Sequence, residues 1–285
     1  MPEGDSVAGH AELLRPILVG RQIAAVSGSA SAVLGRPALV QGMTYGADMA
    51  LLVNEGDIYR GDLRTGSGAQ LVESVLIPAP DRLTLCLSSQ AGCAMACVFC
   101  ATGWSGYRRN LTAGEIVAQY RGARRWAEEN GYGPITNVVY MGMGEPLMNR
   151  GPVMDSLAIL NHGYAVGARR ITVSTVGIVP GILELARRPE QFRLAVSLHA
   201  PNHELRQKIV PVEKKYPLPQ LMDALRAFEA AGGRRITFEY VMIDGVNDDP
   251  ALADELAVLA GEFHAHVNLI PFNQVPGTGW RPSPE

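Results

Sequence analysis

Three cysteines within eight residues are the feature of this sequence with the clearest chemical meaning. Cys93, Cys97 and Cys100 occur in one segment, separated by three and two residues. Three thiolates on a loop can bind three irons of a [4Fe–4S] cube and leave the fourth iron open. An open iron can chelate a small molecule through an amine and a carboxylate. The spacing therefore indicates an iron–sulfur centre with one ligand position left for a small molecule.

A zinc site is the alternative interpretation of these cysteines, completed by a histidine such as His199. Zinc prefers four closed ligands, which usually come from two well-separated pairs, so the iron–sulfur centre is favoured. Cys86 lies seven residues before Cys93 in a candidate strand and is interpreted as a small buried hydrophobe. Because only four cysteines occur and three are clustered, we expect a reducing compartment and no disulfide framework.

The elements that must position the cysteines alternate between strand-like and helix-like patterns from about residue 83 onward. Such alternation predicts right-handed βαβ units and a parallel sheet. Six strands are too few for a closed eight-stranded barrel, so we expect an α/β fold with an open, partial (β/α)6 barrel. The predicted strands are 83–89, 135–141, 170–175, 193–198, 236–242 and 266–272, and the predicted helices are 113–129, 152–162, 180–187, 219–231 and 250–263.

The first part of the chain has a different pattern. Short β-like runs at 22–26 and 49–53 are separated by glycine-rich turns, and no cysteine occurs there. We therefore expect two parts, a small, mostly β N-terminal segment over 1–68 and the partial barrel over 69–285.

Composition and charge restrict the location and the partners. No stretch of 18 or more apolar residues occurs and the N-terminus is polar, so a cytoplasmic protein without a membrane partner is expected. A net charge of −3 argues against nucleic-acid binding by bulk charge but leaves room for local basic patches. Basic doublets could contact phosphates, and solvated helix ends are the alternative interpretation. The doublets are 108–109, 124–125, 169–170, 214–215 and 234–235.

Polar residues follow the predicted strands at their carboxyl ends, where parallel α/β folds gather functional groups. Taken singly, each has a structural alternative: a turn residue, a helix-starting acid or a core histidine. Together they favour a cofactor pocket at one mouth of the barrel. These residues are Gly144 and Glu145 after the second strand, Ser174 at the third, Ser197 and His199 at the fourth, and Asn273 at the sixth.

Seven segments of the sequence resemble the RlmN/Cfr family of radical S-adenosylmethionine (SAM) RNA methyltransferases. The first, 88–103, holds the C-x3-C-x2-C signature of the radical SAM superfamily, with Phe99 before the last cysteine. The resemblance covers about residues 69–280. The other segments, in family order, are 109–111, 141–147, 169–175, 197–201, 239–248 and 268–273.

This resemblance implies methylation of C2 of an adenine in 23S ribosomal RNA and, in some members, in tRNA. It also implies a flavodoxin- or ferredoxin-type electron donor, and we expect a monomer. Glu73 matches the family's proton acceptor, a role that partial burial would favour by raising its pKa; an exposed strand residue is the alternative. The implied cluster ligands are Cys93, Cys97 and Cys100, and the implied SAM site consists of Gly144, Glu145, Ser174, Ser197, Leu198, His199 and Asn273.

Two departures from the family affect these expectations. No cysteine follows Cys100, whereas the family carries its methyl group on a cysteine near the C-terminus. We therefore expect a C-terminally truncated piece, with a radical SAM protein of other chemistry as the alternative. At the other end, 1–7 and 18–21 resemble formamidopyrimidine/endonuclease VIII DNA glycosylases, with Pro2 as nucleophile and Glu3 as its acid/base partner. The parts that grip DNA are missing, so a working glycosylase is not expected.

Overall fold

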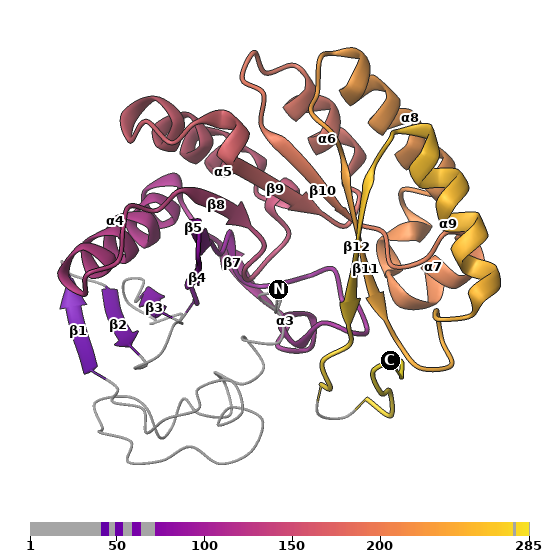
Figure 1. The fold of residues 1–285 in the computed structure, drawn as a ribbon, viewed down its shortest axis with the longest axis horizontal. Helices are drawn as coiled ribbons and strands as arrows, with labels where there is room; N and C mark the ends of the chain where they lie inside the picture. Colours follow the sequence, from indigo (N-terminus) through magenta and orange to yellow (C-terminus); the bar gives the residue numbers. More distant parts are fainter. Residues whose placement is uncertain (1–40, 46–48, 54–58, 64–71, 276–277, 285) are drawn as a thin grey trace.

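One ten-stranded sheet with helices along its outer side makes up the described part of the protein (Figure 1). The computed structural model describes residues 41–45, 49–53, 59–63, 72–275 and 278–284. The strand order is β1-β2-β3-β4-β5-β8-β9-β10-β11-β12. None of the helices within these ranges has the length and apolar character needed to span a bilayer.

Six neighbouring strands of this sheet run parallel and form the partial barrel. Each coincides with a predicted strand, which confirms the expected (β/α)6 arrangement. The six strands are β5 (Arg82–Cys86), β8 (Asn137–Tyr140), β9 (Ile171–Thr175), β10 (Arg193–Ser197), β11 (Thr237–Met242) and β12 (His266–Pro271). Three of these strands, β5, β10 and β11, are buried along most of their length, as is usual for strands inside a parallel sheet.

The five predicted helices are confirmed, with ends shifted by at most a few residues. The first has the same bounds as predicted because Thr112 and Glu115 form a capping box at its start. The third and the fifth carry a proline in their first turn, as predicted from their sequences. The helices are α4 (Ala113–Glu129), α5 (Arg150–Ala158), which continues as a π turn over Ile159–Gly163, α6 (Val179–Ala186), α8 (Leu218–Ala230) and α9 (Pro250–Glu262).

Several short elements were not predicted because they are too brief to show a hydrophobic period. Among them, α3 and α7 contribute to the site described below. The helical ones are α3 (Ala101–Trp104), α7 (His203–Ile209) and the 3-10 turns η2 (Pro146–Met148), η4 (Ala168–Arg170) and η5 (Pro211–Lys214). The strands are β6 (Gln90–Gly92) and β7 (Tyr107–Asn110), which pair as a separate two-stranded sheet.

An antiparallel meander extends the sheet on the side of β5. It consists of β1 (Gln41–Tyr45), β2 (Met49–Val53), β3 (Tyr59–Leu63) and β4 (Val75–Ala79). The strand predicted over 49–53 is confirmed as β2 with the same bounds, whereas β1, β3 and β4 were not predicted. The strand predicted over 22–26, the residues Pro2 and Glu3, and the boundary between residues 68 and 69 lie outside the described residues.

Two apolar clusters hold the site in place. The larger joins the inner strands to the covering helices. The smaller contains Cys97 and Phe99 of the cysteine loop, Ile209 of α7, and Ile270 and Phe272 of β12 and its end. Burial of each such side chain stabilises the fold by roughly 1.5–3 kcal/mol. The cysteine loop is thus packed onto the last strand, far from it in sequence.

Candidate functional site

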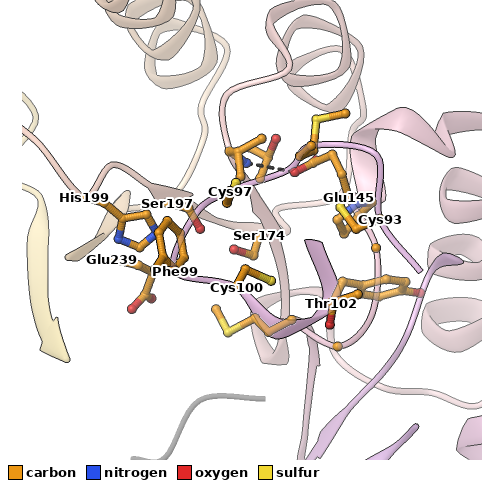
Figure 2. A pocket seen from close by; sticks show the side chains of 18 residues that line it. Cys93, Cys97, Phe99, Cys100, Thr102, Glu145, Ser174, Ser197, His199 and Glu239 are labelled. Atoms are coloured by element: carbon orange, nitrogen blue, oxygen red, sulfur yellow. Dashed lines mark hydrogen bonds between the residues drawn. The ribbon is translucent and has the colours of Figure 1, made fainter. Parts of the chain in front are cut away.

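A pocket opens where the parallel strands end, and all three clustered cysteines line it (Figure 2). The empty space in it, including the part open to solvent, is about 680 Å³. The lining combines polar groups with apolar side chains such as Met95 and Phe99. Of the predicted site residues, those that line it are Cys93, Cys97, Cys100, Gly144, Glu145, Ser174, Ser197 and His199.

The cysteine loop is held by backbone contacts at both of its ends. Gly92 has φ of +75°, and a Cβ there would lie 1.8 Å from the carbonyl oxygen of Gly106, so no other residue fits. The amide of Cys93 donates to that same oxygen at 3.1 Å. At the other side, the amide of Val98 donates to the carbonyl of Ile209 on α7 at 3.1 Å. The spacing of the thiols is therefore fixed by β6, β7 and α7 together.

The placement of His199 bears on the zinc alternative for the cysteines. Within the described ranges, no three His, Cys, Asp or Glu side chains lie close enough to hold one metal ion. His199, the fourth ligand of the zinc alternative, accepts a hydrogen bond at Nδ1 from the amide of Val241 at 3.1 Å. Its ring also meets the ring of Phe99, with the centroids 4.3 Å apart. These placements disfavour the closed zinc site.

Burial keeps His199 neutral. The side chain is 2% exposed, and burial lowers its pKa to about 3, with the charge of Arg206 acting in the same direction. Its backbone has φ of +57°, a strained conformation for a residue with a side chain. Asn247 stabilises that conformation, because its side-chain amide donates to the carbonyl of His199 at 2.8 Å. His199 therefore offers the pocket a neutral, rigidly held ring.

The glycines after β8 allow close backbone approach. A Cβ on Gly142 would lie 2.8 Å from the carbonyl of Leu87, and one on Gly144 would lie 2.5 Å from Cβ of Gln90. Gly144 also has φ of +100°, which other residues rarely adopt. This turn packs so tightly on the start of the cysteine loop that only glycine fits at both positions.

Glu145 joins the ends of two strands. Its carboxylate accepts from the amide of Leu147 at 3.0 Å and from the amide of Val176, just past β9, at 2.9 Å. Burial raises the pKa of this carboxyl to about 7, although the hydrogen bonds from Val176, Thr175 and Leu147 act to lower it. Glu145 therefore caps the start of η2, which is the structural alternative considered for this acid. Its side chain also lines the pocket.

Glu239 is a lining residue that the sequence analysis did not single out. It lies on β11 in register with Ser197 of β10, so the two side chains share the pocket face. Asn268 of β12 donates to its carboxylate at 2.7 Å. The signal in the sequence that could have identified Glu239 is an acid among aromatic and apolar residues on a predicted strand. The pocket therefore contains a carboxylate from β11 beside the serine from β10 (Figure 2).

Three predicted site residues do not line the pocket. Leu198 is fully buried in the larger apolar cluster. Asn273 lies exposed just beyond β12. Glu73 is half-buried before β4, where its carbonyl accepts from the hydroxyl of Ser88 at 2.5 Å. Their roles stay predictions.

A buried ion pair beneath the pocket was also missed. Arg206 of α7 and Glu213 of η5 are fully buried and bonded to each other. The guanidinium also donates to the carbonyls of Val176 at 2.6 Å, Leu198 at 3.2 Å and Ser197 at 3.4 Å. Arg206 thereby holds the ends of β9 and β10 together. A single arginine on a short polar helix gave no signal of this role.

Comparison with known proteins agrees with this geometry. The model of the radical SAM superfamily matches residues 87–256, which include the cysteine loop and four of the helices along the barrel. The chain belongs to the radical SAM superfamily. Members of this superfamily use a [4Fe–4S] cluster and SAM. The three cysteines and the glycine-lined pocket fit these two groups.

Relatives within the superfamily are RNA methyltransferases by name. A protein from Gemmatimonas aurantiaca is 53% identical over 216 residues, 75% of this chain and 58% of that protein. One from Opitutus terrae is 50% identical over 239 residues, 78% of this chain and 63% of that protein. One from Halorhodospira halophila is 50% identical over 217 residues, 75% of this chain and 59% of that protein. All three are named dual-specificity RNA methyltransferase RlmN, the first two with the qualifier probable.

A solved structure shares the fold. The radical SAM methyltransferase from Sphaerobacter thermophilus is 46% identical, with a TM-score of 0.76 over 86% of this chain and 70% of that one. The chain spans only 58% to 63% of the lengths of the first three curated relatives that it matches.

Proposed function

We propose that this chain is the catalytic core of a radical SAM RNA methyltransferase. Its substrate would be C2 of an adenine in 23S ribosomal RNA, with a tRNA adenine as a second substrate. The observation that carries the proposal is one pocket lined by Cys93, Cys97 and Cys100 together with the glycine turn and Glu145. Support comes from relatives named dual-specificity RNA methyltransferase at about half sequence identity.

The target atom explains why such a pocket is needed. C2 of adenine is electrophilic, and no base can convert it into a nucleophile, so polar methyl transfer from SAM fails. When bound, the cluster and SAM supply one-electron chemistry that can activate an unreactive C–H bond. The work of the protein is to bind these groups, keep water away and present the adenine.

Each pocket residue has a role that follows from its chemistry. We infer that the three thiolates bind the cluster and that the backbone around Gly144 lies along the bound SAM. Ser174 and Ser197 offer hydroxyls, and neutral His199 offers an apolar ring face. Glu145 keeps the glycine turn against β9 through the amide of Val176.

The residues outside the pocket lining have proposed roles as well. Leu198 contributes its backbone to the SAM site, and Asn273 closes over it from the end of β12. Glu73, half-buried near β5, is proposed as the proton acceptor. We further propose a monomeric, cytoplasmic protein without a membrane partner, reduced by a flavodoxin- or ferredoxin-type donor.

Anaerobic reconstitution with iron and sulfide tests the proposal. The wild-type chain should bind about four irons, turn brown, and release 5′-deoxyadenosine from SAM when reduced. Alanine at Cys93, Cys97 or Cys100 should abolish the colour. Cys86→Ala is the matched control, since Cys86 is buried away from the pocket and should leave the iron content unchanged. A colourless wild-type protein that binds zinc instead would refute the proposal.

The proposed methylation of RNA is tested by incubating a fragment of 23S ribosomal RNA with the reduced protein. Mass spectrometry then identifies any methylated adenosine. C2-methyladenosine is the expected product. The family resemblance implies a methyl-carrying cysteine, and no cysteine follows Cys100 in the 285 residues, so we expect this product only when the assay also contains a form of the protein with an added cysteine-bearing tail. Release of 5′-deoxyadenosine with no methylated adenine from either form would favour a radical SAM protein of different chemistry.

A further inference from the structure

An exposed aromatic surface borders the cluster pocket and has no role in the site described above. Trp104 is 52% exposed at the end of α3, and Tyr107 is 44% exposed at the start of β7. Both follow closely on Cys100 and Thr102, which line the pocket. Large aromatic side chains are costly to leave in water, so two of them beside a pocket indicate a binding surface.

Trp104 is held in place although it is exposed. Its indole Nε1 donates to the carbonyl of Val98, inside the cysteine loop, at 3.0 Å. Its amide also donates to the carbonyl of Cys100 at 3.3 Å. The polar atom of the ring is therefore used by the protein, while the ring still presents a large area to solvent. A ring fixed in this way loses little conformational entropy when a flat partner stacks on it.

One arginine supplies positive charge near the two rings. Residues 101–110 contain two arginines and no acidic residue, and one of the two is paired with an acid of α4. Arg109 is fixed by Glu115 of α4, with N···O distances of 2.7 and 2.9 Å. Arg108 is exposed, and no ion pair joins it to an acid within the part of the chain that the structure describes. It lies on the opposite side of β7 from Tyr107, because side chains alternate along a strand.

We propose that Trp104 and Tyr107 stack on unpaired bases of the substrate RNA that flank the target adenine, and that Arg108 contacts a neighbouring phosphate. Aromatic faces combined with arginine are the usual means of holding single-stranded RNA. A stacked flanking base would keep the target nucleotide at the pocket mouth. This inference rests on the proposed function, because it names the surface by which the same site takes its RNA.

An electron-donor protein is the other class of partner that an exposed surface beside a redox centre could serve. The observations favour RNA, because a fixed, exposed indole with an exposed tyrosine and an exposed arginine close by in the chain match bases and a phosphate. The experiment below includes an arm for the electron donor.

The test measures the affinity of the full chain for an RNA hairpin with unpaired adenines in its loop, by fluorescence anisotropy. Trp104→Ala and Tyr107→Ala should each weaken binding by roughly 5- to 150-fold, the range typical of one base–aromatic stack. Tyr107→Phe, which keeps the ring, should bind as the wild type does. Arg108→Ala should lower the slope of log affinity against log salt by about one.

Two control variants remove exposed side chains elsewhere. Val258→Ala deletes an apolar group that is 75% exposed on α9, and Arg124→Ala deletes an exposed arginine that pairs with Glu128 on α4. Neither should change the affinity for the hairpin. All the altered side chains are exposed, so the circular dichroism spectra should match that of the wild type.

The outcomes separate this inference from the proposed function. Wild-type affinity in both Trp104→Ala and Tyr107→Ala overturns the inference, and so does a wild-type chain that binds no hairpin. Unchanged RNA affinity with slower cluster reduction by flavodoxin also overturns it and assigns the surface to the electron donor. Release of 5′-deoxyadenosine without RNA reports on the cluster alone. Loss of that release with stacking-dependent RNA binding would refute the proposed function and leave only the RNA-binding role of the two aromatic rings.

Discussion

Removal of the acid from the buried pair beneath the pocket should destabilise the protein more than removal of both partners. Glu213 accepts from the guanidinium of Arg206, from the amide of Leu218 at 2.6 Å, and from the ring of His203 at 2.7 Å. In Glu213→Leu, the charge of Arg206 stays fully buried with only carbonyl oxygens as partners.

The magnitude follows from the position of the pair. Both side chains are 0% exposed, so solvent cannot screen the charge that remains. Breaking such a pair typically costs about 3–5 kcal/mol, whereas replacing both partners by apolar groups of similar size is often close to neutral. The double variant Arg206→Met/Glu213→Leu leaves the carbonyls of Val176 and Leu198 without their donor, a loss of roughly 1–3 kcal/mol. The double variant should therefore be more stable than the single one.

Urea unfolding followed by circular dichroism measures this order. We expect Glu213→Leu to have the lowest midpoint, the double variant an intermediate one, and the wild type the highest. Glu128→Leu serves as the control, because Glu128 forms an exposed pair with Arg124, and its midpoint should match that of the wild type. A double variant no more stable than Glu213→Leu would refute the argument from uncompensated charge.

Three further predictions concern the positions around the pocket. Burial raises the pKa of Glu145 to about 7, so this carboxyl contributes stability that is fully present below about pH 4.5 and is lost, by on the order of 3 kcal/mol, as the pH rises through 7. Urea midpoints of the wild type and of Glu145→Gln between pH 5 and 8 isolate this contribution, because all other titrating groups are common to both proteins; a difference between the two that does not change with pH would contradict the assignment. Gly144→Ala should lower the free energy of unfolding by about 1–3 kcal/mol more than Gly232→Ala does. Both glycines have positive φ, but only at Gly144 would a Cβ meet Gln90. Equal free energies of unfolding for the two variants would show that the turn can shift. Thr112→Ala removes half of the capping box of α4 and should cost about 1 kcal/mol in thermal or urea unfolding, whereas Thr112→Ser should retain most of that stability.

The sequence was sufficient for the six parallel strands and the five long helices that alternate with them. The strands are short apolar runs bounded by turn residues, and β5, β10 and β11 are buried along most of their length, so the pattern was strong. The bounds of α4 could be predicted because the cap that starts it, Thr112 with Glu115, is local in sequence. The cysteine motif and the glycine turn were likewise visible, since each depends on neighbours within a few residues.

The missed features depend on contacts between distant residues. Arg206 appeared to be an ordinary helix arginine, and only the fold places it among carbonyls of β9 and β10. Glu239 faces the pocket because of its register with Ser197, and strand register is not encoded by either residue alone. Leu198, just past β10, has its side chain in the core, which only the fold could show, so its predicted place at the SAM site would involve its backbone.

The sequence by itself determined the types of chemistry available: three thiols at a fixed spacing, glycines where backbone must come close, and strands that end in polar groups. These are local properties, set by residue type and by neighbours along the chain. Only the tertiary structure decided which of these groups share one pocket, which charges are buried beneath it, and which aromatic rings remain exposed at its edge. Those properties arise from the packing of segments more than a hundred residues apart, such as the cysteine loop against β12.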